Sequence, residues 1–543
     1  MVFARRSTTL LAAIIASCAM VLSLTACTSD NKTVVDGQTT VTSNSAGGVA
    51  VFTPSDGITL NQQMPLNKWA KLVPDLAKAL ADAGFKKGDI DHTTSDSLAK
   101  QSRAIQDFVV DHLSNNTTDD SGIAIAPDNM TLLVAPVVEA DASTRQYGDY
   151  VSQNLSTNDA TDGEATSDGE SSEDDSSKDD SSNTESDSTA SDEQAQAVDR
   201  LVSSLKLAKE SGMHVVLLGN SIEGYKPDAF VKFSDAQTIG KLQAEKMVSK
   251  LKLDKASKDN PKYIEVLLPY TAVDEKGNAN DSTFAQEAFR GIWQVLGSYY
   301  QKGVVESPSG TLDGKSTEND WQAVAYDAAK EGSTAKVLDK RLAKTDGQST
   351  LTRIDGIITM NDYIASEVVK ELDDLGYTGS AADINPQITI SGIVGNITGK
   401  KDLSRDAVPD PIKSPENDNA NDSSSSDDDA DEDTSASDKD RDSQWPLVTG
   451  YGAYVSNIPS IVNGKQWMTG MEDRQTIATD IAQACAKLNK DEALNSMPSI
   501  RNSEVGGVKK IPTISEPLLA VSASNLKSAL IDPGYISLAD AGL

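Results

Sequence analysis

The chain has 543 residues, with 82 acidic against 49 basic residues and a formal net charge of −33. A chain of this length can form two domains, each large enough to bury a core of its own. The acidic excess argues against nucleic acid as a partner, because surfaces that bind nucleic acid are basic.

Residues 1–26 have the composition of a targeting segment, in which an arginine pair precedes a largely apolar run over residues 10–24. The run is too short and too early in the chain for a membrane span. A Leu-Thr-Ala tripeptide then precedes Cys27, the pattern of a lipoprotein signal peptide. We expect lipid on Cys27 to anchor the mature protein to the outer face of the cell membrane, with an ordinary secreted protein as the alternative. Cys485 is then the last cysteine, which excludes an internal disulfide and predicts a buried apolar role.

Three further segments have compositions typical of disorder. Residues 27–48 are rich in Ser, Thr, Asn and Gly and predict a flexible tether. Residues 155–195 hold 14 Asp/Glu against one Lys, and residues 411–442 hold 12 against three Lys/Arg. Because these two segments have almost no apolar residues to bury, we predict disordered insertions in surface loops. Neither has the glycine turn and terminal glutamate of a calcium loop, so no metal site is expected.

The rest of the chain alternates between short apolar runs and amphipathic segments, which is the pattern of an α/β protein. Strands are predicted at 49–52, 131–138, 214–218, 263–268, 354–359, 387–393 and 447–450, and helices at 68–85, 101–113, 195–211, 284–300, 327–343, 363–375 and 475–488. Strands that alternate with helices of ten or more residues form mostly parallel sheets.

The stretch 228–251, DAFVKFSDAQTIGKLQAEKMVSKL, combines a strand with a helix. An alternating apolar run ends at Ser234-Asp235, and apolar residues then recur at helical spacing. Ser234 or Asp235 can cap this helix by accepting hydrogen bonds from its first backbone N–H groups. Ligands of open α/β sheets bind at the carboxyl ends of such strands. Asp235 is therefore a candidate ligand contact, with a purely capping role as the alternative.

No catalytic group can be assembled from the sequence. The three histidines, His92, His112 and His214, are scattered without the spacing of a zinc site or a catalytic triad. An S-x-x-K pattern at Ser333 recurs elsewhere by chance and lacks a following K-T-G. Residues 310–316 are one residue short of a phosphate-binding loop. We expect neither enzymatic activity nor a cofactor.

Five stretches, in the same order, resemble a family of sugar receptors. FVKFSDAQTIGKLQA is similar to the YxxFDNxxVGxLQA stretch of the xylose- and multiple-sugar-binding branch of extracytoplasmic substrate-binding proteins, the soluble receptors of sugar ABC transporters. The other four stretches are MPLNKWAKLVPDLAKALADAGF, IDGIITMNDYIASEVVKELDDLGY, LVTGYGAYVSNIPSIVNGKQWMTGMED and IPTISEPLLAVSASNLKSALIDPGY. The resemblance implies a periplasmic-binding-protein-like type I fold, in which two Rossmann-like lobes, each a mostly parallel sheet flanked by helices, are joined by a hinge.

The resemblance also implies a division of the mature chain. We expect an N-terminal lobe at 49–226, a C-terminal lobe at 227–472, a return to the N-terminal lobe at 473–515 and a C-terminal segment at 516–543.

Candidate ligand-binding residues follow from the matched positions. Lys68 and Trp69 match a basic–aromatic pair at the family's cleft, where an indole face suits the C–H face of a sugar, and the alternative for Trp69 is a core position. Asn361 and Asp362 match an Asn-Asp pair at the end of a strand, where the carboxylate can accept from sugar hydroxyls. Asp235 falls in the family's Asp-Asn segment.

Other ligand positions of the family are changed. Asn220, Ala236 and Gly452 stand where the family has Arg, Asn and Asp. Loss of a bidentate arginine and a carboxylate removes strong charge-assisted hydrogen bonds, so the ligand is expected to differ from the family's usual monosaccharide or to bind in another pose. Asn220 stays a candidate contact.

The sequence therefore predicts a monomeric, lipid-anchored receptor that binds a small polar ligand, a sugar by resemblance, and delivers it to an ABC permease in the membrane. The alternative is a degenerate homologue that acts as a sensory or protein-interaction module. The changed positions favour that alternative, and the retained Trp69, Asn361 and Asp362 oppose it.

Overall fold

The computed structural model describes part of the chain. The described residues are 33–35, 38–40, 46–55, 65–115, 125–138, 144, 146–150, 153–156, 184–273, 280–328, 330–343, 351–381 and 445–543. Among them, no helix combines the length and the apolar character that crossing a membrane requires. The predictions for 1–26, Cys27, 387–393 and 411–442 lie outside the described residues.

The chain divides into two units, residues 1–44 and 45–543. In the first unit, β1 (Thr33–Val35) pairs antiparallel with β2 (Gln38–Thr40).

A seven-stranded sheet organises the first lobe of the second unit. Its strands are β3 (Gly48–Pro54), β4 (Ile90–Ser95), β5 (Met130–Val134), β7 (His214–Leu218), β9 (Ala229–Lys232), β17 (Ile500–Val505) and β18 (Val508–Ser515). They are ordered β4-β3-β5-β7-β9-β18-β17, and only β17 runs antiparallel to its neighbour. The first five strands follow the doubly wound 2-1-3-4-5 order, which puts a ligand crevice at their carboxyl ends.

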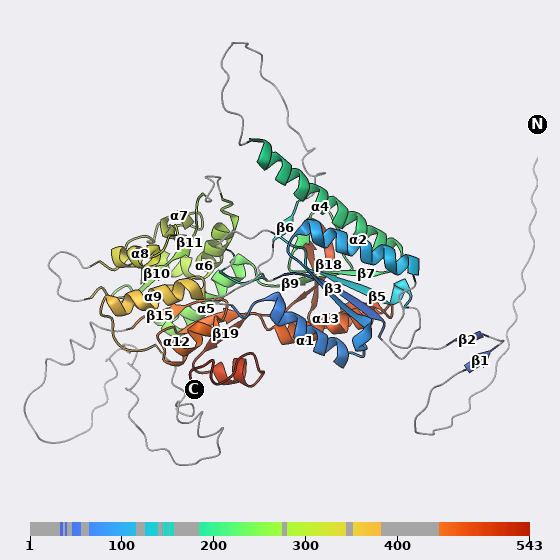
Figure 1. Ribbon diagram of the computed structural model, residues 1–543. Helices are drawn as coiled ribbons and strands as arrows, with labels where there is room; N and C mark the ends of the chain where they lie inside the picture. The colour runs from blue at the N-terminus through green and yellow to red at the C-terminus, as the bar shows by residue number, and fades with distance from the viewer. Residues whose placement is uncertain are drawn as a thin grey trace, which may run out of the picture. The chain divides into compact units, whose positions relative to one another are not determined.

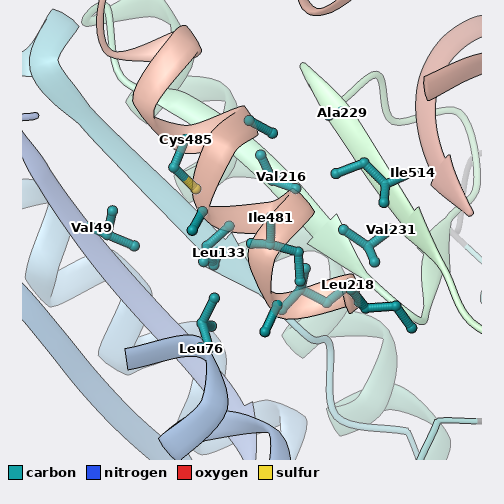
Figure 2. Close-up of a cluster of buried hydrophobic side chains, with 14 of the residues drawn as sticks. Val49, Leu76, Leu133, Val216, Leu218, Ala229, Val231, Ile481, Cys485 and Ile514 are labelled. Carbon is teal, nitrogen blue, oxygen red and sulfur yellow. The ribbon is translucent and has the colours of Figure 1, made fainter. Parts of the chain in front are cut away.

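Helices cover both faces of this sheet. On one face lie α1 (Trp69–Asp82) and α13 (Arg474–Leu488), and on the other lie α2 (Leu98–Asn115) and α4 (Thr184–Glu210) (Figure 1). Successive strand residues alternate between the two cores, so Val49 faces α1 and α13 whereas Ala50 faces α2 and α4. Figure 2 shows Leu76 of α1 and both Ile481 and Cys485 of α13 packed over the strands. The prediction of a buried Cys485 is confirmed.

A four-stranded parallel sheet organises the second lobe. Its order is β12 (Val305–Glu306), β10 (Lys262–Val266), β14 (Gly356–Ile358) and β15 (Leu447–Thr449). On one face pack α5 (Ala236–Leu251) and α6 (Thr283–Gln301), and on the other pack α8 (Ser333–Arg341) and α9 (Asp362–Asp374). Glycines bring α5 and α6 together, because a Cβ on Gly240 would lie 2.2 Å from the carbonyl oxygen of Ala288.

Shorter elements complete the second unit. They are β6 (Asn154–Leu155), which pairs with β8 (Ser221–Ile222), β11 (Leu268–Pro269), which pairs with β13 (Ala325–Tyr326), the helices α7 (Trp321–Val324) and α12 (Ile458–Val462), and a π-helical turn at Lys527–Ile531.

The chain passes between the two sheets three times. It crosses from β9 to α5, from β16 (Met468–Met471) to α13, and from β18 to β19 (Leu519–Ser522), which pairs antiparallel with β16. Backbone hydrogen bonds from Trp467 to Val448 and from Gly470 to Gly450 attach β16 beside β15. The predicted α/β fold of two mostly parallel, helix-flanked sheets is confirmed.

Several boundaries differ from those expected. β9 belongs to the seven-stranded sheet, although the sequence boundary put residues from 227 on in the second lobe. Part of the segment 155–195, expected to be disordered, is ordered, since Leu155 is buried in β6 and residues from Thr184 on are helical in α4. The helix predicted at 327–343 is shortened to α8, because Gly332 adopts a positive φ of 71° just before it.

Candidate ligand-binding site

Buried polar residues gather where the chain crosses between the lobes. Glu472, which directly follows β16, accepts a hydrogen bond from the backbone N–H of Ser234 at 2.6 Å and one from the Tyr451 hydroxyl at 3.4 Å. The hydroxyls of Ser234 and Tyr451 also hydrogen-bond each other. All three side chains are at most 4% exposed. Burial raises the pKa of Glu472 to about 7, against the opposing effect of these hydrogen bonds.

Asn67 extends this cluster from the first lobe. It precedes α1 and is 1% exposed, and its Oδ1 accepts from the backbone N–H of Glu472 at 3.3 Å. Among the described residues, its Nδ2 has no hydrogen-bond partner. A buried amide donor without a partner costs free energy that a ligand acceptor would recover.

The segment 146–150 runs beside Asn67. Asp149 accepts from Lys68 Nζ at 2.7 Å and from the backbone N–H of Trp69 at 3.1 Å. Its own backbone N–H donates to the carbonyl oxygen of Asn67 at 2.8 Å. The ring of Tyr150 stacks on Phe233, with 4.8 Å between the centroids. These contacts fix the end of the segment to the first lobe.

The beginning of the same segment contacts the second lobe. Asn361 Nδ2 donates to Gln146 Oε1 at 3.1 Å, and the Tyr454 hydroxyl donates to the carbonyl oxygen of Gln146 at 2.8 Å. The ring of Tyr147 lies 4.7 Å from that of Phe284 and 6.3 Å from that of Tyr451, centroid to centroid. The segment 146–150 therefore touches both lobes.

The predicted contact Trp69 is buried. Its side chain is 3% exposed and belongs to the core of the first lobe, edge-to-face with Tyr150 at 5.1 Å and with Phe233 at 5.7 Å. Its neighbour Lys68 is held in the ion pair with Asp149.

Asn361 and Asp362 have structural partners at the start of α9. Asn361 caps the helix, since its Oδ1 accepts from the backbone N–H of Ile364 at 2.9 Å. Asp362 is fully buried and accepts from the backbone N–H of Tyr454, from Gln466 Nε2 and from Thr469 Oγ1, all at 2.7 to 2.9 Å.

The burial of Asp362 affects its ionisation and its neighbour. Burial raises the pKa of Asp362 to about 6, against the lowering effect of the three hydrogen bonds. Gly450 permits the close packing, because a Cβ there would lie 2.1 Å from Asp362 Oδ1.

The side chains of Asp235 and Asn220 also hydrogen-bond to the protein itself. Asp235 caps α5, as predicted, by accepting from the backbone N–H of Thr238 at 2.7 Å, and it pairs with Lys232 at 2.8 Å. Asn220 joins two loops of the first lobe, accepting from the backbone N–H of Gln153 and donating to the carbonyl oxygen of Pro136. Of the six predicted residues, only Lys68 and Asn361 hydrogen-bond through their side chains to the segment 146–150.

Sequence reasoning missed Asn67, Tyr451, Glu472, Gln146 and Tyr147. The first three lie at the start of a helix or just after a strand, where polar residues of α/β proteins gather at the carboxyl edge of a sheet. Gln146 and Tyr147 lie in a polar stretch without periodicity, so no local signal marks them.

The charges in this region are balanced. Lys68 is neutralised by Asp149, and burial raises the pKa of Glu472 to about 7 and that of Asp362 to about 6, which disfavours their charged forms. No cluster of His, Cys, Asp and Glu among the described residues could hold a metal ion. Such surroundings suit an uncharged, hydroxyl-rich ligand better than an ion.

No model of a known protein family matches the sequence, and no curated protein matches it significantly. Solved structures that match this chain include an ABC transporter solute-binding protein from Clostridium phytofermentans with bound β-D-glucose, at 17% identity over 91% of this chain and 99% of that one, with a TM-score of 0.44. A carbohydrate transporter solute-binding protein from Chloroflexus aurantiacus in complex with D-glucose is 19% identical over 92% and 98%, with a TM-score of 0.42. A periplasmic ribose ABC transporter protein from Conexibacter woesei is 13% identical over 90% and 96%, with a TM-score of 0.41.

Proposed function

We propose that this protein is an extracytoplasmic solute-binding protein that holds a small uncharged ligand, a sugar, between its two lobes. One observation carries the proposal. Polar residues at the ends of elements in both lobes hydrogen-bond either to Glu472 or to the segment 146–150, and these are Asn67 and Ser234 from the first lobe and Asn361 and Tyr451 from the second. Amide and hydroxyl groups beside aromatic faces are the combination that sugar recognition requires.

The three chain crossings support a mechanism of closure. Each lobe has its own sheet and its own cores, and residues 233–235, 472–473 and 516–518 connect them. A hinge motion needs only a few residues at such crossings to change φ and ψ. A ligand that contacts both lobes stabilises the closed form by the contacts that the open form lacks.

Binding defines the first experiment. The mature protein, made soluble by Cys27→Ser, is titrated calorimetrically with pentoses, hexoses and short oligosaccharides. We expect at least one to bind, and Asn361→Ser to weaken that binding about tenfold, because serine keeps the helix cap and removes the amide donor. Asn525→Ser, whose side chain hydrogen-bonds to Ser522 and Ala520 in the C-terminal segment, is the matched control. If no sugar binds, the proposal fails and the sensory or interaction module takes its place.

Anchoring and transport complete the proposal. The Leu-Thr-Ala-Cys pattern after an apolar run supports lipidation of Cys27, and a lipid-anchored receptor at the outer face of the membrane would pass its ligand to an ABC permease. Cys27→Ser should release the protein from cell membranes into the medium, whereas Cys485→Ser should not. Retention of the Cys27→Ser protein on membranes would rule out the lipid anchor.

A further inference from the structure

The segment 146–150 forms a strap from one lobe to the other. Its end is fixed to the first lobe by Asp149, through Lys68 and the backbone of Trp69, and by the stacking of Tyr150. At its beginning, Gln146 accepts hydrogen bonds from the side chains of Asn361 and Tyr454 in the second lobe. A strap of this kind contributes contacts to the closed arrangement that separated lobes would lose.

The ring of Tyr147 packs into the hydrophobic core of the second lobe. It is 1% exposed and lies against the rings of Phe284 and Tyr451, both of which belong to the second lobe. A six-membered ring with two flat faces is thus accommodated beside aromatic side chains, the surroundings in which the C–H faces of a pyranose also bury well.

Gln146, next to Tyr147, makes polar contacts with the second lobe. Its side-chain oxygen accepts from the Asn361 amide and its backbone oxygen accepts from the Tyr454 hydroxyl. These donors belong to the beginning of α9 and to the loop after β15, at the carboxyl ends of the second lobe's strands. Two donors beside an aromatic site are suited to a ring that carries two oxygen acceptors.

From this geometry we infer that Gln146-Tyr147 is a built-in ligand of the inter-lobe site, and that a diffusible ligand binds by displacing it. The ligand class follows from the occupant: an uncharged six-membered ring with at least two hydroxyl oxygens as acceptors. This inference rests on the proposed function of the same site. A tethered competitor acts at a high effective concentration, so it lowers the apparent affinity by the fraction of molecules in which it is bound.

Removal of the competing ring tests the inference. Tyr147→Ala is compared with the wild type and with Tyr300→Ala, which removes an equally buried ring from the interior of the second lobe. The probes are D-glucose, D-xylose and myo-inositol, with sorbitol as an open-chain polyol. We expect Tyr147→Ala to bind at least one ring-shaped probe about tenfold or more tightly than the wild type, with Tyr300→Ala unchanged. Equal or weaker binding by Tyr147→Ala would overturn the inference, since Tyr147 would then be a wall of the site.

A second measurement does not depend on any sugar. Loss of the strap should separate the lobes, so small-angle scattering of free Tyr147→Ala should give a larger radius of gyration than the wild type, whereas Tyr300→Ala stays compact. A compact Tyr147→Ala refutes the built-in ligand even if the protein binds sugars. Separated lobes without binding of any probe would show that the strap holds the lobes together, but would refute the proposed function and with it the displacement of Tyr147 by a diffusible ligand.

Gln146→Ala serves if Tyr147→Ala does not fold. It removes the side-chain acceptor of Asn361 and keeps the ring. We expect a smaller shift in the same direction, an affinity gain of about threefold. No gain in affinity by a folded Gln146→Ala protein would count against the inference.

Discussion

The carboxylate of Glu472 accepts the backbone N–H of Ser234 at 2.6 Å, and this bond joins two of the three segments that cross between the lobes. Ser234 lies between β9 and α5, and Glu472 lies between β16 and α13. Because both residues are buried, the bond is formed away from water, where a charge-assisted hydrogen bond is strong. The two crossings are therefore expected to move together.

The buried carboxyl of Glu472 predicts a pH dependence of stability. Its pKa is raised from 4.5 to about 7 on folding, so the folded protein binds this proton more tightly than the unfolded chain does. The free energy of unfolding should therefore fall as the pH rises from about 4.5 to 7, by about 3 kcal/mol from this group. Urea denaturation at several pH values measures it.

Glu472→Gln isolates this contribution. The difference between the wild type and the variant should change across that pH window, whereas Asp82→Asn, a substitution of an exposed residue, should leave the pH dependence of the wild type intact. Parallel curves for the wild type and Glu472→Gln would show that the proton is not bound at Glu472.

Asp362 should behave as a structural residue. Asp362→Ala leaves three buried donors, on Tyr454, Gln466 and Thr469, without their acceptor. We expect the free energy of unfolding to fall by about 3–5 kcal/mol, which chemical denaturation measures. For comparison, Asp235→Ala should cost about 1 kcal/mol as the loss of a helix cap. If the Asp362→Ala protein had wild-type stability but no longer bound sugar, the result would support the sequence prediction that Asp362 contacts the ligand.

Trp69 should contribute to the core rather than to a ligand. Trp69→Ala removes a ring packed edge-to-face against Tyr150 and Phe233, and it should cost about 3–5 kcal/mol of stability. Trp69→Phe keeps an aromatic ring and should cost less. Thermal unfolding of both variants, together with sugar titration, checks this. If Trp69→Ala had the melting temperature of the wild type, the core position of Trp69 would be contradicted.

The ion pair of Arg474 with Asp75 of α1 should stabilise the beginning of α13. Arg474 Nε donates to Asp75 at 2.6 Å, and its guanidinium lies 4.4 Å from the centroid of the Tyr535 ring. Asp75→Ala leaves the buried Arg474 without its partner and should cost about 3 kcal/mol in urea denaturation. Asp82→Ala, which breaks the exposed pair with Lys78, should leave the free energy of unfolding nearly unchanged. Equal effects of the two substitutions would show that the Arg474 pair is not specially protected from solvent.

Local patterns in the sequence predicted most of the helices and central strands. Apolar runs such as 214–218 are buried on both faces of a parallel sheet, and the Asp235 cap depends only on the residues that follow it. The attachment of β18 beside β9 could not be read in this way, because it joins segments that are far apart in the sequence. β18 also alternates too weakly to be recognised alone, with exposed lysines at 509 and 510.

The candidate site was less predictable than the fold. A motif gives the position of a side chain in the chain but not its partners, so Asp362 looked like a ligand contact although three protein donors occupy it. Trp69 suited both a sugar and a core, and the structure shows its ring packed against Tyr150 and Phe233, which no local pattern specifies. The position of Tyr147 against Phe284 is a tertiary contact without any local signal.

Because the chain returns to its first sheet late, the first lobe can fold only after most of the chain has been synthesised. One face of that sheet is covered by Ile477, Ile481 and Cys485 of α13, and β9 gains its outer neighbour only from β18. Both arrive after the four-stranded sheet and β16 of the second lobe have been synthesised. Until then that face carries α1 but not α13, so the nascent chain has no complete first lobe to fold into. A chain arrested before residue 474 should therefore stay sensitive to protease. The first lobe should become compact only after α13 and β18 have been synthesised.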